Sequence, residues 1–224
     1  MKPPYSLALL TDPPTWRGTA LSGRPLDLLA VLAASPQTRV SDDILIEALW
    51  PDDAPARPLR ALHVVAARVR GVVGEGVVER LGDGYRLALP AAQIDVCDLA
   101  DRAERARTRA VEGQWDQVLV LTGSLPQVPA HCEAGDAVGA GPAPLSRLRE
   151  RAVALAEAAR CDRGLALEAT GEHERAAELL REAAQRDAGD EIVLAALMRA
   201  ESWAHSPAAA LEIYEQYRRR LRDR

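Results

Sequence analysis

The stretch Arg57-Pro58-Leu59-Arg60-Ala61-Leu62-His63-Val64-Val65-Ala66-Ala67-Arg68-Val69-Arg70 decides how the first half of this chain folds. Its apolar residues recur at helical spacing, so one face of the helix is expected to be buried, through Leu62, Ala66, Val69 and Val73. The opposite face presents Arg60, His63, Val64, Ala67, Arg70 and Gly71. No acidic residue lies between Asp53 and Glu75, so the charge of the four arginines is uncompensated. The pattern predicts a helix that is anchored on one side and basic on the other.

A hairpin is expected directly after this helix. Val77–Leu89 consists of two short apolar runs joined by Leu81-Gly82-Asp83-Gly84, which is typical of a tight turn. In the second run, Tyr85 and Leu87 share the core-facing side of a strand and Arg86 takes the other side.

The residues before the basic helix complete a recognisable order of elements. Tyr5–Leu10 and Thr19–Leu21 read as short strands, and Pro25–Ala34 reads as a helix that ends at Ser35-Pro36. Ser41 is expected to cap a second helix, which ends at Trp50-Pro51. Helix, turn, helix, linker, basic helix and hairpin together predict a winged helix-turn-helix domain over residues 1–95.

The remainder of the chain, residues 96–224, is expected to be all-α. Its segments of helical spacing are 98–112, 115–121, 145–169, 172–187, 191–204 and 207–221, with a Pro- and Gly-rich loop over 124–144. Gly171–Ala177 aligns with His205–Leu211 at an offset of 34 residues, which is the period of tetratricopeptide helical hairpins. The predicted fold class is therefore mainly α with a small β component: an N-terminal winged helix-turn-helix followed by a tetratricopeptide-like repeat domain.

Composition argues against several classes of function. The only lysine is Lys2 in a Pro-flanked terminus, which suits neither a phosphate-binding loop nor Schiff-base chemistry. Cys97, Cys132 and Cys161 are too far apart for a structural zinc site or a disulfide framework, and the four histidines are scattered. We therefore expect no enzyme activity, no cofactor and no bound metal. No apolar run is long enough for a membrane span or a signal peptide, so the prediction is a soluble, cytoplasmic protein with no membrane partner.

Double-stranded DNA is the partner that the basic helix indicates. The whole chain carries a net charge of −5, so phosphate neutralisation requires arginines concentrated on one face. Arg57 and Arg60 are expected at phosphates or guanine, and Arg70 extends the same cationic face. Arg68 borders the apolar stripe, so it is expected either to reach a phosphate or to pair with an acidic residue. His63, Val64 and Ala67 lie where base edges are met.

Other candidate DNA contacts lie outside this helix. Arg86 or the Gly82-Asp83-Gly84 tip of the hairpin is the candidate for minor-groove or backbone contact. Arg39 and Ser41, at the start of the second helix, are candidate phosphate clamps.

Together these motifs resemble the Streptomyces antibiotic regulatory protein (SARP) family. The resemblance is carried by Leu49-Trp50-Pro51, Ala61–Val65, Arg68-Val69-Arg70 and Gly84-Tyr85-Arg86-Leu87, then by residues 98–107 and the hairpins at Gly171 and Tyr214. It implies an OmpR-type winged helix joined to a bacterial transcriptional activation domain. It further implies an activator of a biosynthetic, antibiotic-type gene cluster that binds promoter direct repeats, often as a homodimer, and recruits RNA polymerase holoenzyme. Relatives usually continue past Arg224, so the chain is expected to be part of a longer regulator.

One alternative belongs to a different class: a helical-repeat interaction scaffold, or a regulatory fragment of a larger ATPase-type regulator, with little DNA binding of its own. The overall acidity and the small apolar centre of the basic helix, Val64–Ala67, favour it. A positive stripe continuous from the basic helix to the hairpin would favour DNA, and a neutral or broken stripe would favour the scaffold.

Overall fold

The structure is a computed structural model that describes residues 5–128, 143–187 and 189–222. The chain divides into two compact units, residues 1–100 with 126–154, and residues 101–125 with 155–224. His131 and Cys132 of the predicted loop lie outside the described residues.

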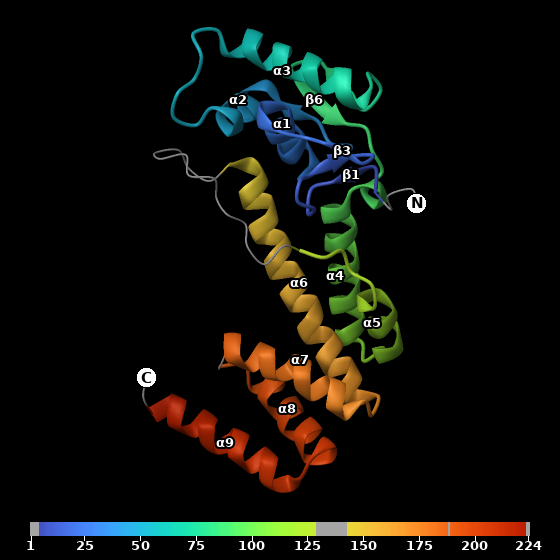
Figure 1. The fold of residues 1–224 in the computed structure, drawn as a ribbon, viewed down its shortest axis with the longest axis vertical. Coiled ribbons are helices and arrows are strands. Elements are labelled where there is room, and N and C mark those ends of the chain that lie inside the picture. Colours follow the sequence, from blue (N-terminus) through green and yellow to red (C-terminus); the bar gives the residue numbers. More distant parts are fainter. Residues whose placement is uncertain (1–4, 129–142, 188, 223–224) are drawn as a thin grey trace. The chain divides into compact units, whose positions relative to one another are not determined.

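The first unit contains the predicted winged helix (Figure 1). A three-stranded antiparallel sheet, β1 (Leu7–Ala8), β2 (Thr15–Trp16) and β3 (Thr19–Ala20), precedes α1 (Gly23–Ala33), β4 (Val40–Ser41) and α2 (Asp42–Leu49). After α3 (Pro58–Val73) come β5 (Val78–Leu81) and β6 (Gly84–Leu87), and the second sheet has the order β4-β6-β5. β6 therefore pairs both with its hairpin partner and with the strand that leads into α2.

Local sequence explains most of these boundaries. The Ser41 hydroxyl accepts a hydrogen bond from the Ile44 amide at 3.4 Å and caps α2, as predicted. Pro58 opens α3, where the missing amide proton costs no hydrogen bond. Gly82 occupies the hairpin turn with a φ of 57°, a left-handed conformation that favours glycine. The predicted hairpin is confirmed.

The core of the winged helix is made where α1, α2, α3 and β6 meet. Leu62, Ala66, Val69 and Val73 are buried, as their spacing predicted, and Val65 joins them. Leu28, Leu45 and Leu49 from α1 and α2 and Leu87 from β6 are also buried. One apolar stripe thus fixes α3 to the rest of the unit and leaves its other face to solvent.

A buried carboxylate holds the N-terminal segment of this unit in place through hydrogen bonds. Asp95, at the start of α4 (Asp95–Val111), accepts hydrogen bonds from the amides of Leu9 at 2.9 Å and Leu10 at 2.8 Å. Arg149, near the start of α6 (Pro144–Ala169), donates to the backbone oxygen of Leu9 at 2.8 Å. Burial raises the pKa of the Asp95 carboxyl, and the amide donors and Arg149 oppose that rise.

The second unit is helical. It contains the rest of α4, α5 (Trp115–Thr122), the rest of α6, α7 (His173–Arg186), α8 (Glu191–Ala204) and α9 (Pro207–Arg222). α8 packs against both α7 and α9 through a core that includes Leu180, Val193 and Leu197 (Figure 1). α9 begins 34 residues after α7, at the predicted repeat period. The predicted fold class is confirmed, with β2 and β4 as strands that the sequence did not indicate.

Candidate nucleic-acid interface

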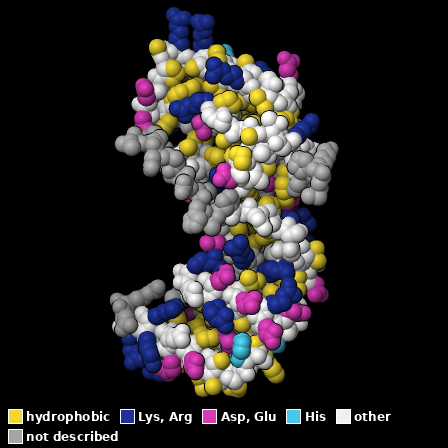
Figure 2. Space-filling view, in the orientation of Figure 1, with side chains coloured by type: hydrophobic (Ala, Val, Ile, Leu, Met, Phe, Trp, Pro, Cys, Tyr) yellow, Lys and Arg dark blue, Asp and Glu magenta, His cyan; other side chains and the backbone are white. Residues whose placement is uncertain are grey.

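The solvent face of α3 presents the side chains expected to meet DNA. Arg60, His63, Val64, Ala67 and Arg68 are all exposed. Arg57 is exposed at the N-terminal end of the helix. Within the described residues, no carboxylate forms an ion pair with Arg57, Arg60 or Arg68, and Figure 2 shows Lys and Arg side chains projecting from the α3 end of this unit. This face is therefore basic and unneutralised.

Arg70 has a different environment from the other arginines of α3. It is half-buried, and its Nε–H donates to the backbone oxygen of Val78 in β5 at 2.7 Å. Its guanidinium carbon lies 5.5 Å from the centre of the Tyr85 ring, which is buried on β6 as predicted. Arg70 consequently ties α3 to the hairpin.

The hairpin carries its own ion pairs. Arg86 pairs with Glu79 directly across the β5–β6 ladder. Arg80 makes two hydrogen bonds to the carboxylate of Asp42, one of them at 2.7 Å, and its guanidinium carbon lies 4.8 Å from the Tyr85 ring centre. Tyr85 therefore lies against both Arg70 and Arg80.

Arg39 and Ser41 lie beside the turn of the hairpin. The Arg39 guanidinium pairs with the Asp83 carboxylate, and the Asp42 amide donates to the Asp83 backbone oxygen at 2.8 Å. Gly84 is buried, and a Cβ there would lie 3.0 Å from the carbonyl carbon of Val40 and closer still to its oxygen. Gly84 thus permits the close approach of β4 and β6.

The structure groups the eleven predicted residues into two sets. Arg57, Arg60, His63, Val64, Ala67 and Arg68 share one exposed region on α3. Arg39, Ser41, Arg70, Gly84 and Arg86 make contacts with or within the hairpin, Ser41 through its strand pairing with Gly84.

Sequence reasoning missed the acidic partners Glu79, Asp42 and Asp83. A signal for Glu79 was present, because a two-residue turn at Gly82-Asp83 places Glu79 opposite Arg86. No comparable signal linked Asp42 to Arg80, since 38 residues separate them.

The described residues contain no cluster of three or more metal-ligating side chains. None of their helices is long and apolar enough to cross a membrane. Burial raises the pKa of the Cys97 and Cys161 thiols to about 11, so both stay protonated at neutral pH.

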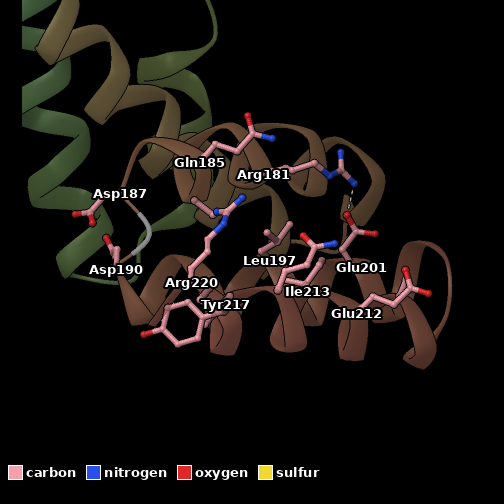
Figure 3. Close-up of a pocket in the computed structure, with 14 residues that line it drawn as sticks. Arg181, Gln185, Asp187, Asp190, Leu197, Glu201, Glu212, Ile213, Tyr217 and Arg220 are labelled. Atoms are coloured by element: carbon pink, nitrogen blue, oxygen red, sulfur yellow. Dashed lines mark hydrogen bonds and ion pairs between the residues drawn. The ribbon is translucent and has the colours of Figure 1, made fainter. Parts of the chain in front are cut away.

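The second unit has a groove of about 300 Å³ along α7, α8 and α9 (Figure 3). Leu194, Leu197 and Ile213 form its apolar part. Figure 3 shows Asp187 and Asp190 at one end and the Arg181–Glu201 ion pair toward the other. Its remaining polar side chains include Gln185, Glu212, Gln216, Tyr217 and Arg220.

Comparisons with known proteins agree with this architecture. Residues 131–224 match the family model described as bacterial transcriptional activator domain. Regulatory protein AfsR of Streptomyces griseus is 32% identical over 100 residues, and regulatory protein AfsR of Streptomyces coelicolor is 34% identical over 101 residues. These alignments cover 41% and 42% of this chain but only 10% of each relative. The matches with the family model and with these regulatory proteins support a role in transcriptional regulation.

A solved structure shares the fold of nearly the whole chain. Mycobacterium tuberculosis EmbR in complex with a low-affinity phosphopeptide superposes with a TM-score of 0.72 and 22% sequence identity. The superposition covers 98% of this chain and 60% of that chain.

Proposed function

We propose, from the resemblance to the Streptomyces antibiotic regulatory protein family that these comparisons bear out, that the chain is a sequence-specific DNA-binding transcriptional activator. The observation that carries the proposal is the exposed face of α3, on which Arg57, Arg60 and Arg68 have no acidic partner among the described residues. Helix α3 of a winged helix is the element that enters the major groove, and its short side chains let the backbone approach base edges.

The roles within this face follow from side-chain chemistry. Arg60 is long enough for bidentate contact with guanine or for a phosphate. Val64 and Ala67 suit a thymine methyl group. Arg57, at the helix start, is best placed for the DNA backbone. The protein acts through binding rather than through catalysis in this proposal.

A titration with one matched control tests the proposal. We expect Arg60→Ala to weaken binding to a selected promoter fragment by ~1–3 kcal/mol if the lost contact is to a base. A phosphate contact would instead give an equal loss on all DNA sequences and a shallower salt dependence. Arg105→Ala removes the same charge from an exposed position of α4 and should leave the affinity unchanged. Fluorescence anisotropy at several salt concentrations supplies both readouts, and wild-type protein that retains no promoter fragment at low salt would refute the proposal.

The finer parts of the proposal concern the promoter. The family resemblance suggests direct repeats upstream of biosynthetic genes, occupied by two copies of the chain, and recruitment of RNA polymerase holoenzyme by the activation domain. Footprinting on the promoters of neighbouring genes would reveal protection of two repeats in one orientation. Transcription in vitro with purified holoenzyme would then rise with the bound fraction. Protection of a single site would contradict the binding of two copies to direct repeats, and an unchanged transcript yield would contradict polymerase recruitment. Neither result would contradict DNA binding itself.

Two observations favour a second candidate, an interaction scaffold built on the helical repeats. The hairpin β5–β6 is the wing of the winged helix. Its arginines are paired with carboxylates, so the positive stripe does not continue from α3 onto the wing. The α7–α9 groove combines apolar and polar side chains, as a peptide-binding surface does. The scaffold predicts that Ile213→Arg abolishes capture of a protein partner, whereas Arg60→Ala does not. The activator predicts that Arg60→Ala weakens promoter binding even when the groove is intact.

A further inference from the structure

The arginines near the wing differ from those on α3 in one respect. Arg39, Arg80 and Arg86 each pair with a carboxylate, from Asp83, Asp42 and Glu79 respectively. Over residues 78–87 the charges of the two arginines and the two acidic residues cancel, so the hairpin has no net charge. A winged helix of this composition brings a cationic helix and a neutralised wing to the same duplex.

The three ion pairs differ in how accessible they are. Asp42 is buried, and its side chain is 12% exposed in the pair with Arg80, so this pair belongs to the fold. The Asp83 side chain is 75% exposed and the Arg39 side chain 49% exposed. Glu79 and Arg86 lie between these extremes, each at 36%. The Arg39–Asp83 pair at the turn is the most exposed of the three, so its carboxylate is the one that a solvent-side anion reaches most easily.

The turn also covers the start of α2. The Asp83 backbone oxygen accepts the Asp42 amide, and the Ser41 hydroxyl accepts the Ile44 amide. The groups that were expected to clamp a phosphate, Arg39 and the first turn of α2, are therefore already occupied by groups of the protein.

We propose that Asp83 is an internal competitor of DNA phosphate for Arg39, and that it restrains the DNA affinity of the wing. The inference rests on the proposed function. A carboxylate and a phosphate offer the same oxygens to a guanidinium group, so DNA can use Arg39 only after Asp83 releases it. Exposed ion pairs are weak, so phosphate can replace Asp83 on Arg39. Breaking the Arg39–Asp83 pair nevertheless lowers the net binding free energy that the Arg39–phosphate contact contributes.

Removal of this one negative charge should therefore strengthen DNA binding. We expect Asp83→Asn to bind a mixed-sequence duplex about two- to tenfold more tightly than wild type at low salt. The magnitude of the slope of log K against log salt should rise by about 0.9, because one more phosphate is neutralised. Asp83→Glu keeps a carboxylate within reach of Arg39 and should retain the wild-type affinity. A mixed-sequence duplex is sufficient, since phosphate contacts do not depend on base sequence.

Two further variants separate partner exchange from a general effect of charge. Asp53→Asn removes the same charge from the exposed α2–α3 loop, where no partner of Asp53 is seen among the described residues. This variant should bind like wild type. In the double variant, Arg39→Ala should abolish the gain of Asp83→Asn, because no guanidinium group is left for the phosphate to bind. Circular dichroism melting checks that the exposed substitution leaves the fold unchanged.

The outcomes are distinguishable. If wild type binds the duplex but Asp83→Asn binds no more tightly than Asp53→Asn, the competitor role is wrong and the DNA-binding function stands. The same holds if the gain survives in the double variant. If wild type and all variants fail to bind any duplex at low salt, the proposed function and this inference are both wrong.

Discussion

Arg60 and Arg70 extend from the same helix, but among the residues that the structure describes only Arg70 has a partner. Its Nε–H bonds to Val78, and its guanidinium group lies on the Tyr85 ring. Helical spacing predicts only the direction in which a side chain points from the helix, so the sequence places both arginines on the polar face of α3. Which group a side chain then contacts depends on the hairpin, whose residues eight and fifteen positions after Arg70 return to α3.

This difference predicts different effects of two alanine substitutions on folding. Arg70→Ala should lower the free energy of unfolding by about 1–2 kcal/mol, since it removes a hydrogen bond to Val78 and a cation–π contact with Tyr85. Arg60→Ala removes an exposed side chain and should leave stability within about 0.5 kcal/mol of wild type. Urea denaturation followed by circular dichroism measures both. Equal stability of the two variants would contradict the contact that we assign to Arg70.

Among the elements, the helices, the β5–β6 hairpin and the short strands β1 and β3 were predictable from the sequence, whereas β2 and β4 were not. The apolar period of α3 and the 34-residue repeat of α7 and α9 are local patterns, and both appear where the sequence indicated. β2 and β4 contain two residues each and exist through pairing with distant strands, so no local period reveals them. The same holds for the candidate site. Its exposed α3 residues were predicted from local sequence, whereas the ion pairs to Asp42 and Asp83 depend on the pairing of β4 with β6.

The β4–β6 pairing depends in turn on Gly84, which predicts a specific loss of stability. The side chain of Gly84→Ala would overlap the backbone of Val40, and backbone atoms cannot move aside as a flexible side chain can. We expect the variant to be destabilised by about 1–3 kcal/mol, with a lower melting temperature. Gly76→Ala, in the loop before β5, places its methyl group in open space and should be neutral or slightly stabilising. If Gly84→Ala melted at the temperature of Gly76→Ala, β4 would not pack against β6 as described.

For the whole molecule, the relevant quantity is how many positive charges reach DNA from a protein of net charge −5. Seven arginines lie on or beside the winged helix face: Arg39, Arg57, Arg60, Arg68, Arg70, Arg80 and Arg86. Four of them are held by protein groups, namely Asp83 for Arg39, Val78 for Arg70, Asp42 for Arg80 and Glu79 for Arg86. The count of available charges is therefore set by intramolecular pairing rather than by composition.

Salt dependence measures that count directly. If Arg57, Arg60 and Arg68 supply the phosphate contacts, the slope of log K against log salt for one copy on a mixed-sequence duplex should be about −3. Participation of all seven arginines would give a slope of about −6. Anisotropy titrations at several salt concentrations distinguish the two values, with Arg68→Ala as the reference that should reduce the magnitude by about 0.9. A slope near the larger value would mean that DNA breaks the internal ion pairs with ease. Asp83 would then have little control over affinity, because its competition with phosphate would already be lost in the wild type.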